Sequence, residues 1–190
     1  MFKDDFIGVY DGALSLDECQ RLINLFEKED SSRKRVTSET IRYNAADKRA
    51  LTLAVDVNNP KDAKYHTFLE KAINKSLLHY RNKYYDSLMD QEYWDLHPQY
   101  NFQKYSDGEG YYSLHHEHGY HAPYRMLVWM LYLNNSPSGT EFPYQKKVLK
   151  AKSGRMVFWP ASWTHLHKGV TPNKGIKYIM TGWFTYCINN

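Results

Sequence analysis

The sequence predicts an α+β fold in which helices come first and a β unit of the jelly-roll type follows. Two stretches in the N-terminal half carry apolar residues at helical spacing. From residue 93 the chain changes to short apolar runs parted by turn sequences, which is typical of antiparallel barrels and sandwiches. The 190 residues suit one domain, with helical support over residues 1–92 and a core barrel over residues 93–190.

The first helix is predicted by a capping box at Ser15-Leu16-Asp17-Glu18. Cys19, Leu22, Ile23 and Phe26 follow at a spacing that places them on one face. The two cysteines of the chain are far apart and form no CxxC pair, which argues against a disulfide framework and against a structural zinc finger. We therefore expect Cys19 to be a small core residue.

A polar stretch separates this helix from the next apolar segments. Asp30–Arg49 is nearly free of apolar residues and is interpreted as an exposed surface loop. Ala50–Val57 alternates like a strand. Pro60 opens a second helix, whose apolar stripe is expected to pack on a sheet. The stripe consists of Tyr65, Phe68, Leu69, Ala72, Ile73, Leu77, Tyr80 and Tyr84.

The C-terminal half is predicted to contain seven strands. Glycine, proline, serine and asparagine separate them, as expected for tight turns. The predicted strands are Trp94–Tyr105, Tyr111–His118, Arg125–Leu133, Thr140–Gln145, Arg155–Trp159, Thr164–Val170 and Lys177–Cys187.

Composition narrows the function classes. The formal charge of +4 is small and evenly spread, which disfavours a nucleic-acid-binding protein. The N-terminus lacks the apolar core of a secretory signal, and no apolar run is long enough to span a bilayer. We expect a cytoplasmic enzyme or binding protein with no membrane association.

Histidine spacing indicates a metal site. If Tyr111–His118 is a strand, His115 and Glu117 point to the same face. A His-x-carboxylate pair joined by a later histidine is the pattern of the two-His-one-carboxylate site of non-haem Fe(II). The later histidine is His165 or His167, which strand periodicity cannot separate.

Joint spacing over about residues 100–186 resembles the 2-oxoglutarate/Fe(II) dioxygenases, and within them the prolyl 4-hydroxylase-like branch of bacteria and phages. That branch carries His-x-Asp, a distal His-x-Gly and a lysine ten residues after the distal histidine. The matching residues here are His115, Glu117, His167 with Gly169, and Lys177. Further matches are Tyr105, Leu131-Tyr132-Leu133-Asn134, Gly139-Thr140-Glu141-Phe142 and Trp183.

The resemblance implies a double-stranded β-helix with iron at the mouth of the barrel, on His115, Glu117 and His167. It also implies 2-oxoglutarate as cosubstrate, O₂ as oxidant and ascorbate as a reductant. Lys177 would pair with the distal carboxylate of 2-oxoglutarate, with Tyr105 and Thr140 beside it. These three residues are the expected cosubstrate-binding groups.

Two points of the resemblance concern the metal ligands themselves. Glu117 stands where the family has Asp, and its extra methylene extends the reach of the carboxylate. The offsets to Gly169 and Lys177 favour His167 over His165 as the distal ligand. The loop Asp30–Arg49 is a candidate lid over the substrate, with Arg42 and Tyr43 positioned to touch a peptide.

Three functions remain open at this stage. The first is hydroxylation of a prolyl residue in a peptide or protein, which the lysine at the tenth position favours. The second is the same dioxygenase chemistry on a free amino acid, a nucleic acid or a metabolite. The third is a non-enzymatic jelly roll that binds metal or sugar. The oligomeric state is left open.

Overall fold

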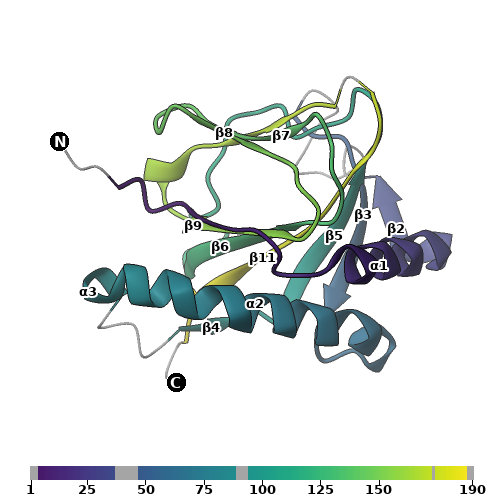
Figure 1. The fold of residues 1–190 in the computed structure, drawn as a ribbon, viewed down its shortest axis with the longest axis horizontal. Coiled ribbons are helices and arrows are strands. Elements are labelled where there is room, and N and C mark those ends of the chain that lie inside the picture. Colours follow the sequence, from purple (N-terminus) through teal and green to yellow (C-terminus); the bar gives the residue numbers. More distant parts are fainter. Residues whose placement is uncertain (1–3, 37–46, 89–93, 173, 188–190) are drawn as a thin grey trace.

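A computed structural model describes residues 4–36, 47–88, 94–172 and 174–187. Two sheets face each other, and the long helices cover the outer face of the larger one (Figure 1). The helices are α1 (Leu16–Lys28), α2 (Ala63–Lys83) and α3 (Tyr85–Leu88), with 3₁₀ turns at Ser31–Arg33, Pro60–Asp62 and Trp163–His165.

Among the described residues, eight strands form the main antiparallel sheet in the order β1-β9-β6-β11-β5-β3-β2, with β4 also paired to β11. Three more strands form the second sheet in the order β10-β7-β8. The main-sheet strands are β1 (Gly8–Tyr10), β2 (Lys34–Val36), β3 (Leu51–Asp56), β4 (Trp94–Leu96), β5 (Gln99–Tyr105), β6 (Arg125–Tyr132), β9 (Arg155–Pro160) and β11 (Lys177–Tyr186). The second sheet contains β7 (Gly139–Phe142), β8 (Lys147–Lys150) and β10 (Lys168–Val170).

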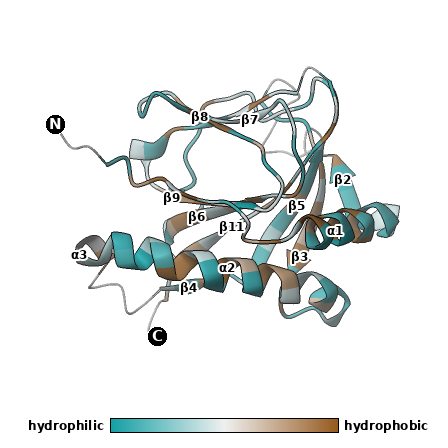
Figure 2. Cartoon of the chain, in the orientation of Figure 1, coloured by the Kyte–Doolittle hydropathy of each residue, from teal (hydrophilic) through white to brown (hydrophobic). Residues whose placement is uncertain are grey.

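Helix α1 begins where the capping box predicts. The Ser15 hydroxyl accepts from the backbone N–H of Glu18, and the Glu18 carboxylate accepts from the backbone N–H of Ser15. Its apolar face is buried against the main sheet through Cys19, Leu22, Ile23 and Phe26. Figure 2 shows this division, with polar residues facing outward on both long helices.

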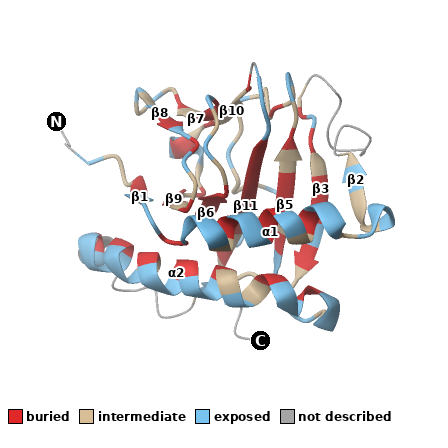
Figure 3. Cartoon of the chain, turned by 45° about the vertical axis from the view of Figure 1, so that its right-hand side comes forward, coloured by how far each residue is buried: buried red, intermediate tan, exposed pale blue. Residues whose placement is uncertain are grey.

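The core has two parts, one on each face of the main sheet. The larger part lies between the sheet and the helices and includes the predicted stripe of α2, with Tyr65, Leu69 and Tyr80 fully buried. The smaller part lies between the two sheets, around Trp159 and Phe142. Strands β6, β9 and β11, which are neighbours in the main sheet, are accordingly mostly buried (Figure 3). The inter-sheet space is where the site described below opens.

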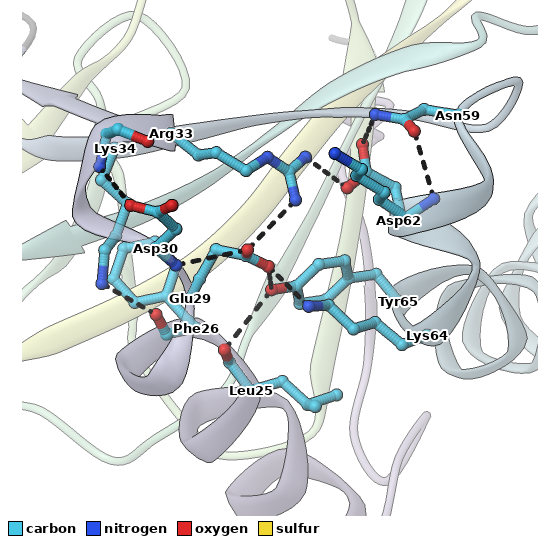
Figure 4. Close-up of polar contacts among 12 residues, drawn as sticks. Leu25, Phe26, Glu29, Asp30, Arg33, Lys34, Asn59, Asp62, Lys64 and Tyr65 are labelled. Carbon is cyan, nitrogen blue, oxygen red and sulfur yellow. Dashed lines mark hydrogen bonds and ion pairs between the residues drawn. The ribbon is translucent and has the colours of Figure 1, made fainter.

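A polar network fixes the edge strand β2 to the helices (Figure 4). The Arg33 guanidinium donates to the buried Asp62 carboxylate at 2.5 Å and contacts Glu29 at 3.2 Å. Asp62 also accepts from the backbone N–H of Asp56 at 3.1 Å, and the Tyr65 hydroxyl donates to Glu29 at 2.9 Å. Because β2 directly follows Arg33, this network sets the position of the strand that carries Arg35.

Several sequence expectations were wrong in detail. Tyr111–His118 is not a regular strand, because its backbone hydrogen bonds go to three separate segments, at Asp47, at Ala161 and at His167–Gly169, and form only isolated bridges. The predicted strand Trp94–Tyr105 is interrupted at residues 97–98, where the chain contains a proline. Thr164–Val170 begins as a 3₁₀ turn and becomes a strand only at Lys168.

Other differences concern short elements and the polar stretch. β1 and β8 were not predicted, since each is three or four residues long and carries no clear alternation. The stretch Asp30–Arg49 contains a 3₁₀ turn and β2, and its Lys48 is buried rather than exposed. Arg42 and Tyr43 lie outside the described residues. The division into support and barrel stays a prediction, although β1, β2 and β3 join the main sheet.

No helix in the described part of the chain is both long enough and apolar enough to cross a membrane.

Replacing Asp62 by Ala should lower the free energy of unfolding by roughly 2–4 kcal/mol, because it leaves Arg33 and the N–H of Asp56 without their buried acceptor. Urea denaturation measures this difference. Arg21→Ala is the control, since it removes an exposed ion pair with Asp17 and should cost less than about 1 kcal/mol. Equal losses in the two variants would show that the network does not stabilise the fold.

Candidate metal centre and anion-binding cavity

A cavity of about 600 Å³ opens between the two sheets. Its walls combine apolar residues of the barrel interior with basic groups and one carboxylate, which is typical of a binding site rather than of a packing defect. The polar residues lining it include Arg35, Lys48, Gln103, Tyr105, Tyr111, His115, Glu117, Arg125, Thr140, His167, Lys177 and Trp183.

The structure brings His115, Glu117 and His167 together at this cavity. One ligand atom from each lies within 4.8 Å of the others. Glu117 Oε1 is 3.5 Å from His115 Nε2 and 3.8 Å from His167 Nε2. Two atoms bonded to one ion at about 2.0–2.2 Å lie up to about 4.4 Å apart, so the distances from Glu117 to the two histidines suit a shared ion.

Backbone carbonyls orient both imidazoles. His115 Nδ1 donates to the Ser113 carbonyl at 3.0 Å, and His167 Nδ1 donates to the His165 carbonyl at 2.9 Å. In each ring the proton is therefore on Nδ1, and the lone pair of Nε2 faces the cavity. Burial, assisted by the neighbouring His167, lowers the pKa of His115, which keeps this ring neutral and able to bind a metal.

The two oxygens of Glu117 have different partners. Oε1 faces the histidines, whereas Oε2 accepts from Arg125 Nη1 at 2.9 Å and from Trp183 Nε1 at 3.1 Å. The Arg125 guanidinium also lies 3.4 Å from the centroid of the Trp183 ring. Burial alone would raise the pKa of Glu117, but His115 and His167 outweigh it and hold the pKa well below its usual value. Glu117 is thus an ionised carboxylate with one oxygen directed at the candidate metal position.

Lys177 is a buried cation on the cavity wall, with 2% of its surface exposed. Strand pairing places it opposite Tyr105, and its ammonium lies 4.6 Å from the Tyr105 ring centroid. It donates to the Gly139 carbonyl at 3.3 Å. Burial, with a further contribution from Lys48, lowers the pKa of Lys177 to about 8.

The glycine after the distal histidine has a steric reason. A Cβ on Gly169 would lie 3.2 Å from the Tyr111 backbone nitrogen and 3.7 Å from Lys177 Nζ. The Gly169 N–H also donates to the Tyr111 carbonyl at 2.8 Å. Glycine therefore avoids a tight contact with the Tyr111 backbone, whereas the contact with the ammonium would be an ordinary van der Waals one.

The remaining predicted residues also line the cavity. The Tyr105 hydroxyl donates to Gln103 Oε1 at 2.8 Å, so its hydrogen bond goes to the protein wall in this state. Thr140 is buried on β7, with its hydroxyl 2.6 Å from that of Tyr132. Their expected roles in binding a cosubstrate stay predictions.

His165 does not join the cluster. It is buried, its Nε2 donates to the Asp5 carbonyl at 2.8 Å, and its Nδ1 is 2.9 Å from the Thr164 hydroxyl. Of the histidines that follow His115, His116 is exposed and His118 donates to the Arg125 carbonyl at 3.1 Å. The geometry therefore favours His167 as the distal ligand.

Sequence reasoning missed Lys48, the stacking of Tyr111 on His115 and the contact of Arg125 with Glu117. Lys48 stands in a polar stretch without periodicity, so no pattern indicated its burial. The other two are contacts between separate segments, which spacing does not encode. The one available signal was a lysine two residues before the predicted strand Ala50–Val57.

Comparison with protein families gives one match, in which residues 100–185 fit the model of the 2OG-Fe(II) oxygenase superfamily. The matched region contains all three residues of the cluster as well as Tyr105, Thr140 and Lys177. The sequence matches no curated protein significantly.

Solved structures with the same fold include a viral collagen prolyl hydroxylase from Paramecium bursaria Chlorella virus-1, in its 2OG complex. It is 21% identical, has a TM-score of 0.69, and the match covers 96% of this chain and 97% of that one. A Pseudomonas putida prolyl-4-hydroxylase is 18% identical, with a TM-score of 0.63 and coverage of 95% and 92%. These likenesses confirm the predicted double-stranded β-helix with N-terminal helices.

A third structure is a prolyl hydroxylase from Trichoplax adhaerens in complex with a hypoxia inducible factor oxygen degradation domain peptide fragment. It is 16% identical, with a TM-score of 0.63, and the match covers 96% of this chain and 84% of that one. The shared fold therefore extends beyond the barrel to the N-terminal helices.

Replacing His115 or His167 by Ala should weaken Co(II) binding more than about 100-fold, since each removes a direct ligand. Titration under nitrogen, followed by the visible absorption of Co(II), measures the affinity. His116→Ala and His165→Ala are the controls and should bind like the parent protein. Loss of binding in His165→Ala, with retention in His167→Ala, would reverse the assignment of the distal ligand.

Replacing Lys177 by Met should stabilise the protein at pH 7 by up to roughly 3 kcal/mol, from a pKa of about 8 in the fold against 10.5 for a free lysine. The folded state binds its proton less tightly, so the penalty is complete below pH 8 and vanishes as the pH rises through 10.5. The gain from the substitution should therefore disappear near pH 10.5.

Urea unfolding at pH 7 and at pH 10.5 tests this expectation. Lys150→Met, on the exposed side of β8, is the control and should change stability by less than about 0.5 kcal/mol. A Lys177→Met protein no more stable than the parent at pH 7 would show that the buried ammonium carries no such penalty.

Proposed function

Because residues 100–185 belong to the 2OG-Fe(II) oxygenase superfamily, we propose that this dioxygenase hydroxylates a prolyl residue in a peptide or protein. The observation that carries the proposal is one continuous cavity with a two-His-one-carboxylate cluster and a buried lysine on its wall. A site with three protein ligands leaves coordination positions open, which suits catalysis rather than structural metal binding.

The donor set fits Fe(II). His115 Nε2, His167 Nε2 and Glu117 Oε1 would hold the ion, since two neutral imidazoles and one carboxylate suit non-haem iron. Iron bound there would supply the oxidising chemistry that, with O₂ and 2-oxoglutarate, converts a C–H bond to C–OH and releases succinate and CO₂. The protein's own part is to bind, orient and shield the reactants.

Lys177 would bind the distal carboxylate of 2-oxoglutarate. Its ammonium is desolvated and held over the Tyr105 ring, so an arriving carboxylate gains a full charge partner without having to order a flexible side chain. Gln103, Tyr105 and Thr140 supply hydroxyl and amide groups on the adjoining wall. A keto acid of this length would then lie with its other end toward the three ligand residues.

A polypeptide substrate is supported by a second hollow beside the metal cluster. His115 lines both hollows, and the second is walled by Leu114, Tyr144 and Trp163, which are 51%, 72% and 70% exposed. Gln145 Nε2 donates to the Thr164 carbonyl at 2.9 Å, which connects the segment of Tyr144 to that of Trp163. Exposed apolar and aromatic side chains suit an extended proline-containing chain better than a small polar metabolite.

The test is succinate release from 2-oxoglutarate with Fe(II), ascorbate and each of three candidate substrates. Proline-rich peptides should stimulate release at least several-fold, and the peptide should gain 16 Da on a proline, seen by mass spectrometry. Free proline and single-stranded DNA should give only background. Each molecule hydroxylated consumes one molecule of 2-oxoglutarate, so the two products should appear in equal amounts.

His115→Ala is the inactive control, because it removes a direct metal ligand. Turnover of free proline or DNA without peptide stimulation would replace the prolyl substrate by that compound. Absence of succinate in every assay, under conditions where Co(II) binds, would contradict dioxygenase activity itself.

A further inference from the structure

The cavity continues from the metal cluster across the inner face of the main sheet to β2 at its edge. Three residues from adjoining strands stand in one row there, since Arg35 of β2 pairs with Thr52 of β3 and Thr52 pairs with Gln103 of β5. All three line the cavity. β2 is the outermost of the described strands on this side of the sheet (Figure 3). We call Arg35, Thr52 and Gln103 the lateral row.

The neighbours of the lateral row along each strand fix the direction of its side chains. Lys34 donates to the Phe26 carbonyl of α1 at 3.1 Å, and Leu53 belongs to the core beneath the helices. The Phe102 ring stacks on that of Phe26, with centroids 4.5 Å apart. Because successive side chains of a strand point to opposite faces, the row points away from the helices and toward the cavity.

The lateral row offers hydrogen-bond donors that the protein does not use. Thr52 is 2% exposed, and its hydroxyl has no hydrogen-bond partner among the described residues. Gln103 Oε1 accepts from the Tyr105 hydroxyl at 2.8 Å, so the free side of this amide is its N–H donors. A buried hydroxyl without a partner costs free energy, which an oxygen of a ligand lying on the row would recover.

Arg35 adds a positive charge at the outer end of the row. It is exposed, and it forms no ion pair or side-chain hydrogen bond with any described residue. Glu117 is the only acid among the described residues that line the cavity, and its Oε2 already accepts from Arg125 and Trp183. One guanidinium beside neutral donors suits a carboxylate, which a guanidinium binds through two parallel hydrogen bonds.

The cosubstrate would lie elsewhere in the cavity. Lys177 and Trp183, which contacts Glu117, are both on β11, so a keto acid between Lys177 and the metal ligands would follow that strand. In the order β11-β5-β3-β2, Arg35 stands three strands away, or about 14 Å at about 4.8 Å per step. A polypeptide spans this distance, since an extended proline-rich chain rises about 3.1 Å per residue.

We propose that the lateral row binds an acidic side chain of the polypeptide substrate, roughly three to five residues from the prolyl residue that is hydroxylated. The inference rests on the proposed function and adds to it a charge preference in the substrate. Arg35 supplies the opposite charge and Thr52 a hydrogen bond. A glutamate in the substrate is therefore preferred to a glutamine of the same length.

Fluorescence anisotropy with labelled peptides tests the preference under nitrogen at pH 7, with Mn(II) and 2-oxoglutarate present, so that binding is measured without turnover. The probes are repeats of Pro-Pro-Glu, Pro-Pro-Gln and Pro-Pro-Lys. The parent protein should bind the Glu repeat about tenfold more tightly than the Gln repeat, and the Lys repeat most weakly. Arg35→Met should bind the Glu and Gln repeats equally. Arg35→Glu should prefer the Lys repeat, and Arg35→Lys should keep most of the parent's preference.

Thr52→Val keeps the shape of the side chain and removes its hydroxyl. It should weaken binding of the Glu repeat roughly threefold without lowering the stability to urea, because the hydroxyl has no partner in the free protein. Arg21→Met is the matched control, since it removes one charge from an exposed position paired with Asp17, and it should keep the parent's preference. Persistence of the preference in Arg35→Met, or its equal loss in Arg21→Met, would overturn the inference.

Hydroxylation assays with the same repeats separate this inference from the proposed function. Hydroxylation of the Gln repeat, with no preference for glutamate that depends on Arg35, would overturn the inference and leave the proposed function intact. A preference that depends on Arg35, without hydroxylation of any repeat, would contradict the proposed function and retain the acidic-peptide site. Failure of the parent protein to bind any of the three repeats would contradict both.

Discussion

Two backbone hydrogen bonds between His115 and His167 hold the site together. The His115 N–H donates to the His167 carbonyl at 3.0 Å, and the His167 N–H donates to the His115 carbonyl at 2.9 Å. Residues that exchange both bonds in an antiparallel pair stand directly opposite each other, with their side chains on the same side. Two imidazoles from distant parts of the chain are thereby fixed in one place. The Glu117 N–H, bonded to the Ala161 carbonyl at 3.0 Å, places the carboxylate beside them.

The cavity stores unfavourable electrostatic energy that the rest of the fold must offset. Lys48 and Lys177 are both desolvated, and the pKa of each is lowered to about 8, only about one unit above neutral pH. A penalty of roughly 3 kcal/mol for one such lysine is large against the total of about 5–15 kcal/mol for a domain. The helices on the far face of the main sheet and the network around Asp62 supply stability away from the site. Because the stabilising contacts lie away from the cavity, the buried lysines can keep their positive charge for an anion while the fold remains intact.

Sequence reasoning succeeded where the signal is local or where a joint spacing restricts the answer. The capping box located the start of α1, and the spacing of His115, Glu117 and His167 predicted three side chains that the fold brings together. It failed where tertiary contacts decide the outcome. Residues 111–118 alternate like a strand, yet they pair with three different segments and form no ladder. Lys48 is buried by a contact with Tyr111 that no periodicity reveals.

The replacement of Asp by Glu at position 117 is explained by the groups on its outer side. Oε1 lies toward the two histidines, and Oε2 lies within hydrogen-bond distance of Arg125 and Trp183. The added methylene makes the carboxylate more flexible, and a flexible ligand loses affinity unless its orientation is fixed. Arg125 and Trp183 fix the orientation of the carboxylate by hydrogen bonding to Oε2. The Arg125 guanidinium also stacks on the Trp183 ring, 3.4 Å from its centroid, which restrains both partners. The longer side chain and its two partners therefore act together to present a single oxygen to the two histidines.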